Sequence, residues 1–320
     1  MTQVQLQQLQ RQLWNIANDL RGKMGADEFR DYILGFIFFK YLSEKAITFA
    51  NELLKDEGMA EKYNELDESN PDHAELIEGI KENSVDEVGY ALSPSQLFHT
   101  LAERGRQNQF ILDDLAETLR AIERSTLGAE SEDDFANLFE DLDINSTKLG
   151  NNANDRNELI SKVLTHLDNI DFDLSNSESD VLGDAYEYLI GEFASGAGKK
   201  AGEFYTPQTV STLLAKIVTQ GKERLRSVYD PTCGSGSLLL RVKREVKDVD
   251  MIFGQEMNRT TYNLARMNMI LHDVHFAKFD IKQEDTLTRP QHIDMRFDAV
   301  VANPPFSAKW SADPIYLQDE

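Results

Sequence analysis

The stretch that decides the fold is Phe297–Phe306, which reads FDAVVANPPF. It begins as an apolar, β-branched run and ends in Asn303, Pro304 and Pro305. Apolar runs bounded by turn residues are typical of buried strands in parallel sheets. Proline has no N–H to give to a sheet, so two consecutive prolines end the strand. The stretch therefore predicts one strand of a parallel α/β sheet, and such sheets bind ligands where their strands end.

The residues that end this strand suit a planar ligand that carries an amino group. Asn303 has an amide oxygen, Pro304 and Pro305 have carbonyl oxygens without a competing N–H, and Phe306 has a flat apolar face. Hydrogen-bond acceptors beside one aromatic ring fit a nucleobase with an exocyclic –NH2. The alternative is that these residues only form a strand-ending turn.

A second candidate binding element is the glycine-rich turn between a strand expected over 227–229 and a helix expected over 238–246. Its candidate residues are Asp230, Gly234, Ser235, Gly236 and Ser237. Glycine lets the backbone turn tightly and approach a ligand closely. The next expected strand, 251–256, ends in Glu256, 20 residues after Gly236. An acid at that place binds ribose hydroxyls, so an adenosine-containing cofactor is expected.

Further residues around these strands refine the prediction. Leu239 occupies the place of the third glycine in dinucleotide-binding loops, which argues against a nicotinamide cofactor and favours a single nucleoside. A short strand near Phe279 is followed by Asp285, which either accepts from an adenine amine or belongs to a surface turn. Upstream, Thr206 as N-cap and Pro207 at the first helical position predict the start of another helix.

Residues 1–170 show helical patterns and no strand pattern of any length. Apolar residues recur at three- and four-residue spacing, and helices are expected over 4–20, 28–55, 71–83, 108–124 and 155–168. The predicted domains are therefore an all-helical part, 1–170, and an α/β part, 171–320. The helical part either docks a partner or DNA, or only stabilises its neighbour.

Charge and composition narrow the classes of function. Of the 56 acidic side chains, 33 lie in residues 1–170, opposite 16 basic ones. Because acidic surfaces repel the phosphate backbone, the chain is not expected to hold DNA tightly without a partner. Cys233 is the only cysteine, which excludes internal disulfides and cysteine zinc clusters, so no metal site is expected. A glutamine-rich start and a short longest apolar run, 32–39, predict a cytoplasmic protein without a membrane span.

Together these motifs resemble those of S-adenosylmethionine-dependent amino-methyltransferases of DNA. Residues 230–237 match the cofactor loop of that family, and Asn303–Phe306 match its amine-methylating motif. The segment Glu203–Gln208 matches the motif that precedes the loop in the family's gamma-type order. Longer runs, at 13–22, 183–189 and 255–269, are similar to the modification subunit of type I restriction–modification systems.

The resemblance implies a helical N-terminal domain, a Rossmann-like class I methyltransferase domain, and a complex with a specificity subunit, a restriction subunit and a second modification subunit. It implies methylation of the N6 amine of adenine in duplex DNA, protecting host DNA from restriction. Asn303, Pro304, Pro305 and Phe306 are then catalytic. The implied S-adenosylmethionine site comprises Glu203, Phe204, Tyr205, Thr206, Pro207, Gln208, Asp230, Gly234, Ser235, Gly236, Ser237, Glu256 and Asp285. The family's chain continues beyond the Asn-Pro-Pro motif, so a truncation after the fourth motif strand is expected.

Two other functions are compatible with the motifs. The same fold can methylate glutamine side chains of a protein or an RNA base, because both present an –NH2 group. A truncated chain can also be a non-catalytic scaffold that binds partner subunits. The long helical part and the gamma order argue against the first alternative, and binding of S-adenosylmethionine would argue against the second. The sequence shows no region that reads a DNA target, which suggests that another chain does so.

Overall fold

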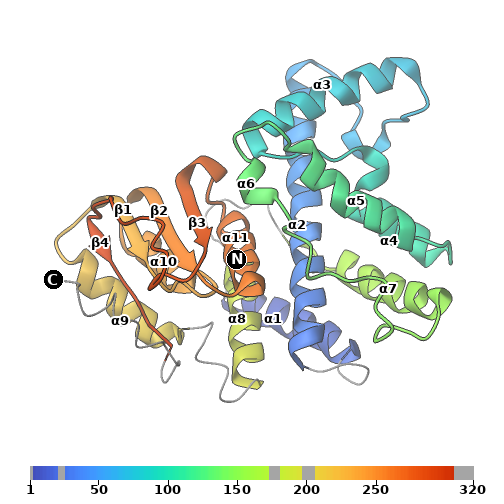
Figure 1. The fold of residues 1–320 in the computed structure, drawn as a ribbon. Coiled ribbons are helices and arrows are strands. Elements are labelled where there is room, and N and C mark those ends of the chain that lie inside the picture. Colours follow the sequence, from blue (N-terminus) through green and yellow to red (C-terminus); the bar gives the residue numbers. More distant parts are fainter. Residues whose placement is uncertain (1–2, 21–25, 173–180, 197–205, 306–320) are drawn as a thin grey trace.

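The computed structural model describes residues 3–20, 26–172, 181–196 and 206–305, and Figure 1 shows a helical part beside an α/β part. No strand occurs among the described residues of the first part, as expected. Its helices are α1 (Gln3–Leu20), α2 (Ala26–Asp56), α3 (Pro71–Val88), α4 (Phe98–Arg106), α5 (Leu112–Ser125), α6 (Glu132–Phe135) and α7 (Ala153–Asp168), and α8 (Val181–Gly196) follows them.

The two ends of α3 show how the neighbouring residues determine where a helix begins and ends. The helix begins at Pro71 after Asn70, whose side-chain oxygen accepts the N–H of Asp72 at 3.1 Å. It continues beyond the expected end at residue 83 and stops only where Gly89 adopts a φ of +96°. Among the helices that the structure describes, none combines the length and the apolar character of a membrane span.

The second part is a four-stranded parallel sheet with the strand order β3-β2-β1-β4. Its strands are β1 (Arg224–Asp230), β2 (Asp248–Glu256), β3 (Phe279–Gln283) and β4 (Ala299–Val300). Three helices accompany them, α9 (Gln208–Thr219) before β1, α10 (Ser237–Glu245) between β1 and β2, and α11 (Arg259–Leu271) between β2 and β3. The parallel α/β sheet that the sequence predicts is confirmed.

The register of the strands brings their carboxyl ends to one edge of the sheet. Asp230, the last residue of β1, is opposite Gly254 of β2, and Glu256 ends β2 at the same edge. On the other side of β1, Tyr229 is opposite Val300 of β4. The strand order therefore changes direction at β1, and open α/β sheets bind ligands outside such a switch point.

The two faces of the sheet are covered differently. α9, α10 and α11 pack in a row on one face. The connection from β3 to β4 covers Tyr229 and Phe253 on the other face. Its Phe297 ring stacks on Tyr229 at 4.6 Å between centroids, and its buried His292 meets both aromatic rings edge-on at 5.3 Å. This packing sets the path of the chain into β4 and thus the position at which β4 ends.

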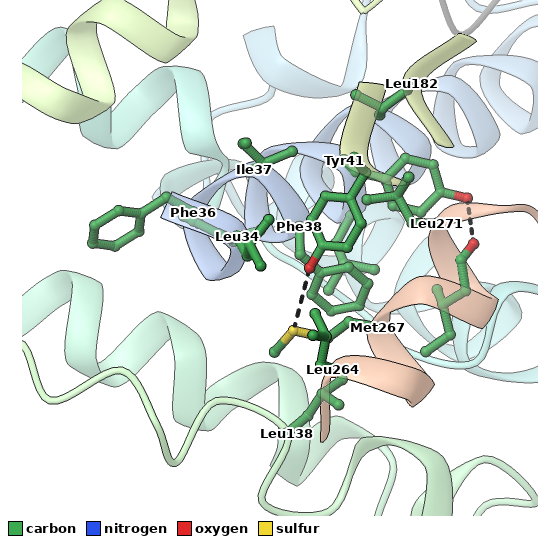
Figure 2. Packing of buried hydrophobic residues seen from close by; sticks show 14 of the residues in the cluster. Leu34, Phe36, Ile37, Phe38, Tyr41, Leu138, Leu182, Leu264, Met267 and Leu271 are labelled. Carbon is green, nitrogen blue, oxygen red and sulfur yellow. Dashed lines mark hydrogen bonds between the residues drawn. The ribbon is translucent and has the colours of Figure 1, made fainter. Parts of the chain in front are cut away.

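An apolar core joins the helical part to the sheet. α8 packs on α1 and α2 of the helical part and on α11 of the α/β part. Figure 2 shows Phe38 of α2 beside Met267 of α11, and Tyr41 of α2 beside Leu271 of α11. The Tyr41 hydroxyl also donates to the carbonyl oxygen of Ile270 at 2.9 Å. Because this core is continuous, the domain boundary expected at residue 170 stays a prediction.

A buried arginine on α11 adds a polar tie between the two parts. Arg266 Nη1 donates to the carbonyl oxygens of Asp133 at 2.8 Å and Ala136 at 3.1 Å, just after the start of α6 and just beyond its end. Its Nη2 donates to Asn263 Oδ1 at 2.6 Å. Burial lowers the pKa of Arg266, and burial raises the pKa of nearby Asp134 to about 7. The tie therefore places charged groups in a poorly solvated interface.

Candidate active site

Residues 230–237 form the turn that the sequence predicts, between the end of β1 and the start of α10. Gly234 and Gly236 adopt φ angles of +56° and +79°, which glycine reaches without strain. A β-carbon on Gly236 would lie 2.7 Å from Met269 Cε of α11. The N–H of Gly234 donates to Glu256 Oε2 at 3.1 Å, which fastens the turn to the end of β2.

Two carboxyl groups lie at the ends of the adjacent strands. Asp230 is 2% exposed and accepts the N–H of Thr232 at 2.9 Å, and burial raises its pKa to about 7. Glu256 accepts the N–H of Gly234 on one oxygen and that of Asn258, at 2.8 Å, on the other, and burial raises its pKa as well. A carboxylate oxygen that accepts one hydrogen bond keeps a lone pair. Glu256 can therefore still accept from a ligand hydroxyl.

Because the carboxyl group of Asp230 is buried, we expect the free energy of unfolding to depend on pH. Its pKa of about 7 exceeds the ordinary value of 3.8, so the native state holds the proton more tightly than the unfolded state does. Stability from this group is complete below pH 3.8 and is lost as the pH rises to about 7. Asp230→Asn should therefore raise the free energy of unfolding by up to about 4 kcal/mol at pH 8, and by little near pH 4. Urea unfolding of both proteins across this pH range measures the difference.

The exposed carboxyl group of Asp86 on α3 supplies the control for that measurement. Asp86→Asn should leave the pH dependence of unfolding as it is in the unsubstituted protein. If Asp230→Asn raised the free energy of unfolding equally at pH 4 and pH 8, the raised pKa of Asp230 would be contradicted. At pH 4 the native carboxyl group is already protonated, so removal of its ionisation has little effect there.

Asn303 lies just beyond β4, on the other side of the switch point from the glycine turn. Its Nδ2 donates to Thr206 Oγ1 at 3.3 Å, although the two residues are 97 positions apart. Because Thr206 holds the amide nitrogen, the amide oxygen is the atom presented to another donor. Pro304 and Pro305 are exposed, and Phe306 lies outside the described residues. The sequence assigned Thr206 and Asn303 to one site, and the structure brings them into contact.

The start of α9 differs from the expectation by one residue. Pro207 is the N-cap, with φ −54° and ψ 137°, and the helix begins at Gln208, so Thr206 is not the cap. A residue before proline is driven towards extended conformations, and here Pro207 stays extended too. The Thr206 hydroxyl is thereby free of capping and accepts from Asn303. Three other residues predicted for this motif lie outside the described ranges: Glu203, Phe204 and Tyr205.

The loop after β3 lies against the glycine turn, since the Thr286 hydroxyl donates to the carbonyl oxygen of Pro231. Asp285 uses its carboxylate inside this loop, where it accepts the N–H of Leu287 at 3.0 Å and the hydroxyl of Thr288 at 3.1 Å. Its contact with a cofactor stays a prediction. The loop nevertheless places the Asp285 backbone beside the expected cofactor site.

Gln255 is a supporting residue that the sequence did not reveal. Its side chain is fully buried, and its Nε2 donates to the carbonyl oxygens of Glu284 at 3.1 Å and Arg289 at 3.0 Å. Its Oε1 accepts the N–H of Gln291 at 3.0 Å. One amide therefore fixes the loop that carries Asp285 to the end of β2. The available signal was a polar side chain inside an apolar strand, which is buried only when hydrogen-bonded.

Glu187 of α8 is a second residue without an expected role, although it lies in one of the runs that carry the resemblance. It is 5% exposed. Its Oε1 accepts the Ser237 hydroxyl at 2.5 Å and Asn268 Nδ2 at 2.9 Å, and its Oε2 accepts Gln208 Nε2 at 2.7 Å. Ser237 and Gln208, both predicted to bind the cofactor, thus direct their side chains to Glu187. Asn268 also donates to the carbonyl oxygen of Ser235 at 2.9 Å.

The carboxyl edge of the sheet around the switch point forms a rim, and its chemistry suits the binding of a nucleoside beside a planar amine. A glycine turn and a carboxylate with spare acceptor capacity lie on one side of the switch point, and amide and carbonyl acceptors lie on the other. Cys233 is buried, and burial raises its pKa well above the ordinary value, which suppresses the thiolate that a nucleophile needs. Within the described ranges, no three side chains of the metal-binding types gather into a group.

Comparisons with known proteins agree with both parts of the structure. A model of the HsdM N-terminal domain matches residues 9–167, and a model of the N-6 DNA methylase family matches residues 177–320. The methylase subunit of the type I restriction enzyme MpnII from Mycoplasma pneumoniae is 38% identical, over 95% of this chain and 59% of that protein. The corresponding MjaIX subunit from Methanocaldococcus jannaschii is 28% identical, over 98% of this chain and 53% of that protein.

A solved structure extends the comparison. The methyltransferase subunit of a type I restriction–modification system from Streptococcus thermophilus matches with a TM-score of 0.83 and 42% identity, over 98% of this chain and 66% of that one. The chain spans about half the length of the curated relatives it matches. It belongs to the family of methyltransferase, or modification, subunits of type I restriction–modification systems.

Proposed function

We propose that this chain supplies the cofactor site and the catalytic motif for methylation of the N6 amine of adenine in duplex DNA by S-adenosylmethionine. It acts as the modification subunit of a type I complex, with a specificity subunit, a restriction subunit and a second modification subunit, and it protects host DNA from restriction. Family membership supports the DNA methyltransferase role. The geometry of the rim supports an amine as the acceptor.

The observation that carries the proposal is the contact between Asn303 and Thr206 at the switch point. β1 and β4 are neighbours in register, because Tyr229 is opposite Val300. The glycine turn after β1 and Asn303 after β4 therefore leave the sheet side by side. A cofactor on the turn and a target held by Asn303 would then meet at one edge, as a direct transfer requires.

The described residues fit a nucleoside cofactor. S-adenosylmethionine supplies a methyl group activated by a positively charged sulfur. Glu256 keeps lone pairs for ribose hydroxyls, and Gly234 and Gly236 allow the backbone to approach closely. The buried carboxyl group of Asp230, with its pKa of about 7, would gain from a nearby positive charge, which favours its ionised form.

The target adenine has to leave the duplex, because its amine is otherwise inaccessible to the site. The Asn303 amide oxygen and the Pro304 carbonyl oxygen then accept hydrogen bonds from the amine. These contacts favour a tetrahedral nitrogen whose lone pair can accept the methyl group. A nitrogen–carbon bond would form as the carbon–sulfur bond breaks, and the methylated amine would then release one proton to solvent. Phe306 is assigned to stack on the base, by resemblance. No covalent intermediate is needed, in keeping with the buried thiol of Cys233.

The acidic surface of the chain supports the need for partner subunits. Residues 1–170 carry about twice as many acidic as basic side chains, which repel the phosphate backbone. Contacts that hold DNA and read its sequence are therefore assigned to the specificity subunit. The helical part is assigned to docking in that complex.

Transfer of a labelled methyl group tests the proposal. The complex is reconstituted with its partner subunits and incubated with S-adenosylmethionine labelled at its methyl group, together with duplex DNA from a strain that lacks the system. We expect the label in DNA as N6-methyladenine and none in DNA that carries the modification already. Label on RNA or on protein glutamine would instead identify another acceptor, and no transfer at all would favour a scaffold.

The contact between Thr206 and Asn303 makes a separate prediction for the rate. Thr206→Val keeps the shape of the side chain but removes the hydroxyl that holds the Asn303 amide. A neutral hydrogen bond contributes about 1 kcal/mol, so methylation should slow about fivefold at saturating cofactor. Thr206→Ser, which retains the hydroxyl, should stay within about twofold. Equal rates for the two variants would show that the hydroxyl does not orient Asn303.

A further inference from the structure

The side chain of Glu187 lies at the meeting point of three helices around the glycine turn. Its carboxylate accepts from Ser237, the first residue of α10, from Gln208, the first residue of α9, and from Asn268 within α11. Each of the three donors is neutral. Two helices therefore begin at one carboxylate, and helix N-termini favour negative charge.

The directions of the hydrogen bonds in this cluster fix the orientation of the glycine turn. Ser237 has a single hydroxyl proton, which it gives to Glu187 at 2.5 Å. The contact of 2.9 Å between the hydroxyls of Ser235 and Ser237 must then run from Ser235 as donor to Ser237 as acceptor. Asn268 donates both to Glu187 and to the carbonyl oxygen of Ser235, so its amide cannot turn round without losing two bonds. The side chain and the backbone of Ser235 are both held.

Gln208 links the cluster to a positive charge. Its Nε2 donates to Glu187, while its Oε1 accepts from Arg241 on α10. The hydrogen bond from Gln208 to Glu187 therefore forms in only one orientation of the Gln208 amide. Asp184, three residues earlier on α8, pairs with Arg244 of α10 at the surface, where an ion pair contributes little to stability.

The geometry points to Glu187 as a positioning residue, which holds the glycine turn and the start of α9 in the arrangement that receives the cofactor. The expected consequence of this role, tighter binding of S-adenosylmethionine, rests on the proposed function. The structural role itself does not. Ser235, Ser237 and Gln208 then serve the site through their backbone, because their polar side chains are used inside the cluster. Because α8 also packs on α1 and α2, Glu187 connects the helical part to the glycine turn.

Glu187→Gln tests this role with little change of volume. The introduced amide satisfies Ser237 and Asn268 with its oxygen, but its nitrogen then faces the nitrogen of Gln208. Gln208 cannot reverse, since its own nitrogen would meet Arg241. Buried groups left without partners are costly, so the Kd for S-adenosylmethionine should rise about tenfold or more. In the ligand-free protein, backbone amides of residues 234–238 should exchange hydrogen faster. Calorimetry and hydrogen exchange of the purified protein measure the two effects.

A second substitution should restore the cluster. In Glu187→Gln combined with Gln208→Glu, the carboxylate introduced at position 208 accepts both from the new amide and from Arg241. We expect the Kd to return to within about threefold of the original and the exchange of residues 234–238 to slow again. Asp184→Asn is the matched control, an acid-to-amide change on the same helix, and should leave both readouts unchanged. The affinity of the assembled complex for DNA should not change in any of these variants.

The two readouts separate the inference from the proposed function. If the unsubstituted protein binds no S-adenosylmethionine, the proposed function fails, while hydrogen exchange still decides the role of Glu187. Unchanged exchange in Glu187→Gln, or a double variant as fast in exchange as the single one, would overturn the positioning role. If Glu187→Gln does not fold, Asn268→Ala takes its place and should speed the same exchange, and unchanged exchange there would overturn the role equally.

Discussion

Replacement of Asn303 by alanine is expected to reduce methylation of duplex DNA by the reconstituted complex on the order of 10³-fold, close to background. The amide oxygen of Asn303 is assigned to the target amine, where charge develops during transfer, and removal of one such preorganised group costs a rate factor of this size. Binding of S-adenosylmethionine should stay within about twofold, because the glycine turn is fastened to Glu256 and not to Asn303. Incorporation of labelled methyl groups and calorimetry measure the two quantities.

An exposed side chain on the connection between β3 and β4 supplies the control for that experiment. Ile293 is 73% exposed, so Ile293→Ala should leave both transfer and cofactor binding unchanged. Transfer at the original rate in Asn303→Ala would remove Asn303 from the mechanism. A parallel loss of cofactor binding would instead show that the rim of β4 shapes the cofactor site.

Replacement of Arg266 by methionine is expected to lower the free energy of unfolding by about 3 kcal/mol. The substitution leaves the carbonyl oxygens of Asp133 and Ala136 without their donor and removes the cation beside Asp134. Asp134 already has a pKa of about 7 with Arg266 present, and loss of the cation raises it further. Stability tied to a raised carboxyl pKa is lost as the pH rises, so the deficit should be larger at pH 8 than at pH 6. Urea unfolding at both pH values measures it.

Arg259 on the same helix offers a matched comparison. Its side chain is 59% exposed and pairs with Glu140 of the same segment of the helical part. Exposed ion pairs contribute about 0–1 kcal/mol, so Arg259→Met should be nearly neutral. Similar costs for the two variants would mean that Arg266 stabilises the interface by apolar packing of its stem and not by its hydrogen bonds.

The sequence predicted those features that depend on local patterns. The apolar run before Asn303 forms the predicted strand, β4, although the strand is short and ends at Val300, before the two prolines that were expected to end it. Gly234 and Gly236 predicted a tight turn, and both have positive φ. The contact of Asn303 with Thr206 follows from the strand order, which the sequence left to the family resemblance.

The sequence could not predict features that arise only from tertiary contacts. Thr206 has the chemistry of an N-cap, but the helix starts later, and the neighbouring β4 gives its hydroxyl another partner. Glu187 is one acid among many in the printed sequence, and its role depends on three helices that meet around it. Gln255 likewise reveals its role only through the loop that it holds. Long-range hydrogen bonds leave no periodic signal.

The continuous core between α2, α8 and α11 has a consequence for how the two parts of the chain can move relative to each other. Sliding of the helical part along α11 would separate the Arg266 guanidinium from the carbonyl oxygens of Asp133 and Ala136, and buried polar groups left without partners are costly. A displacement of α2 is therefore expected to carry α11, and with it the sheet, along with it. In the proposed complex, the partner subunits would then orient both parts of this chain together and would not close one part against the other.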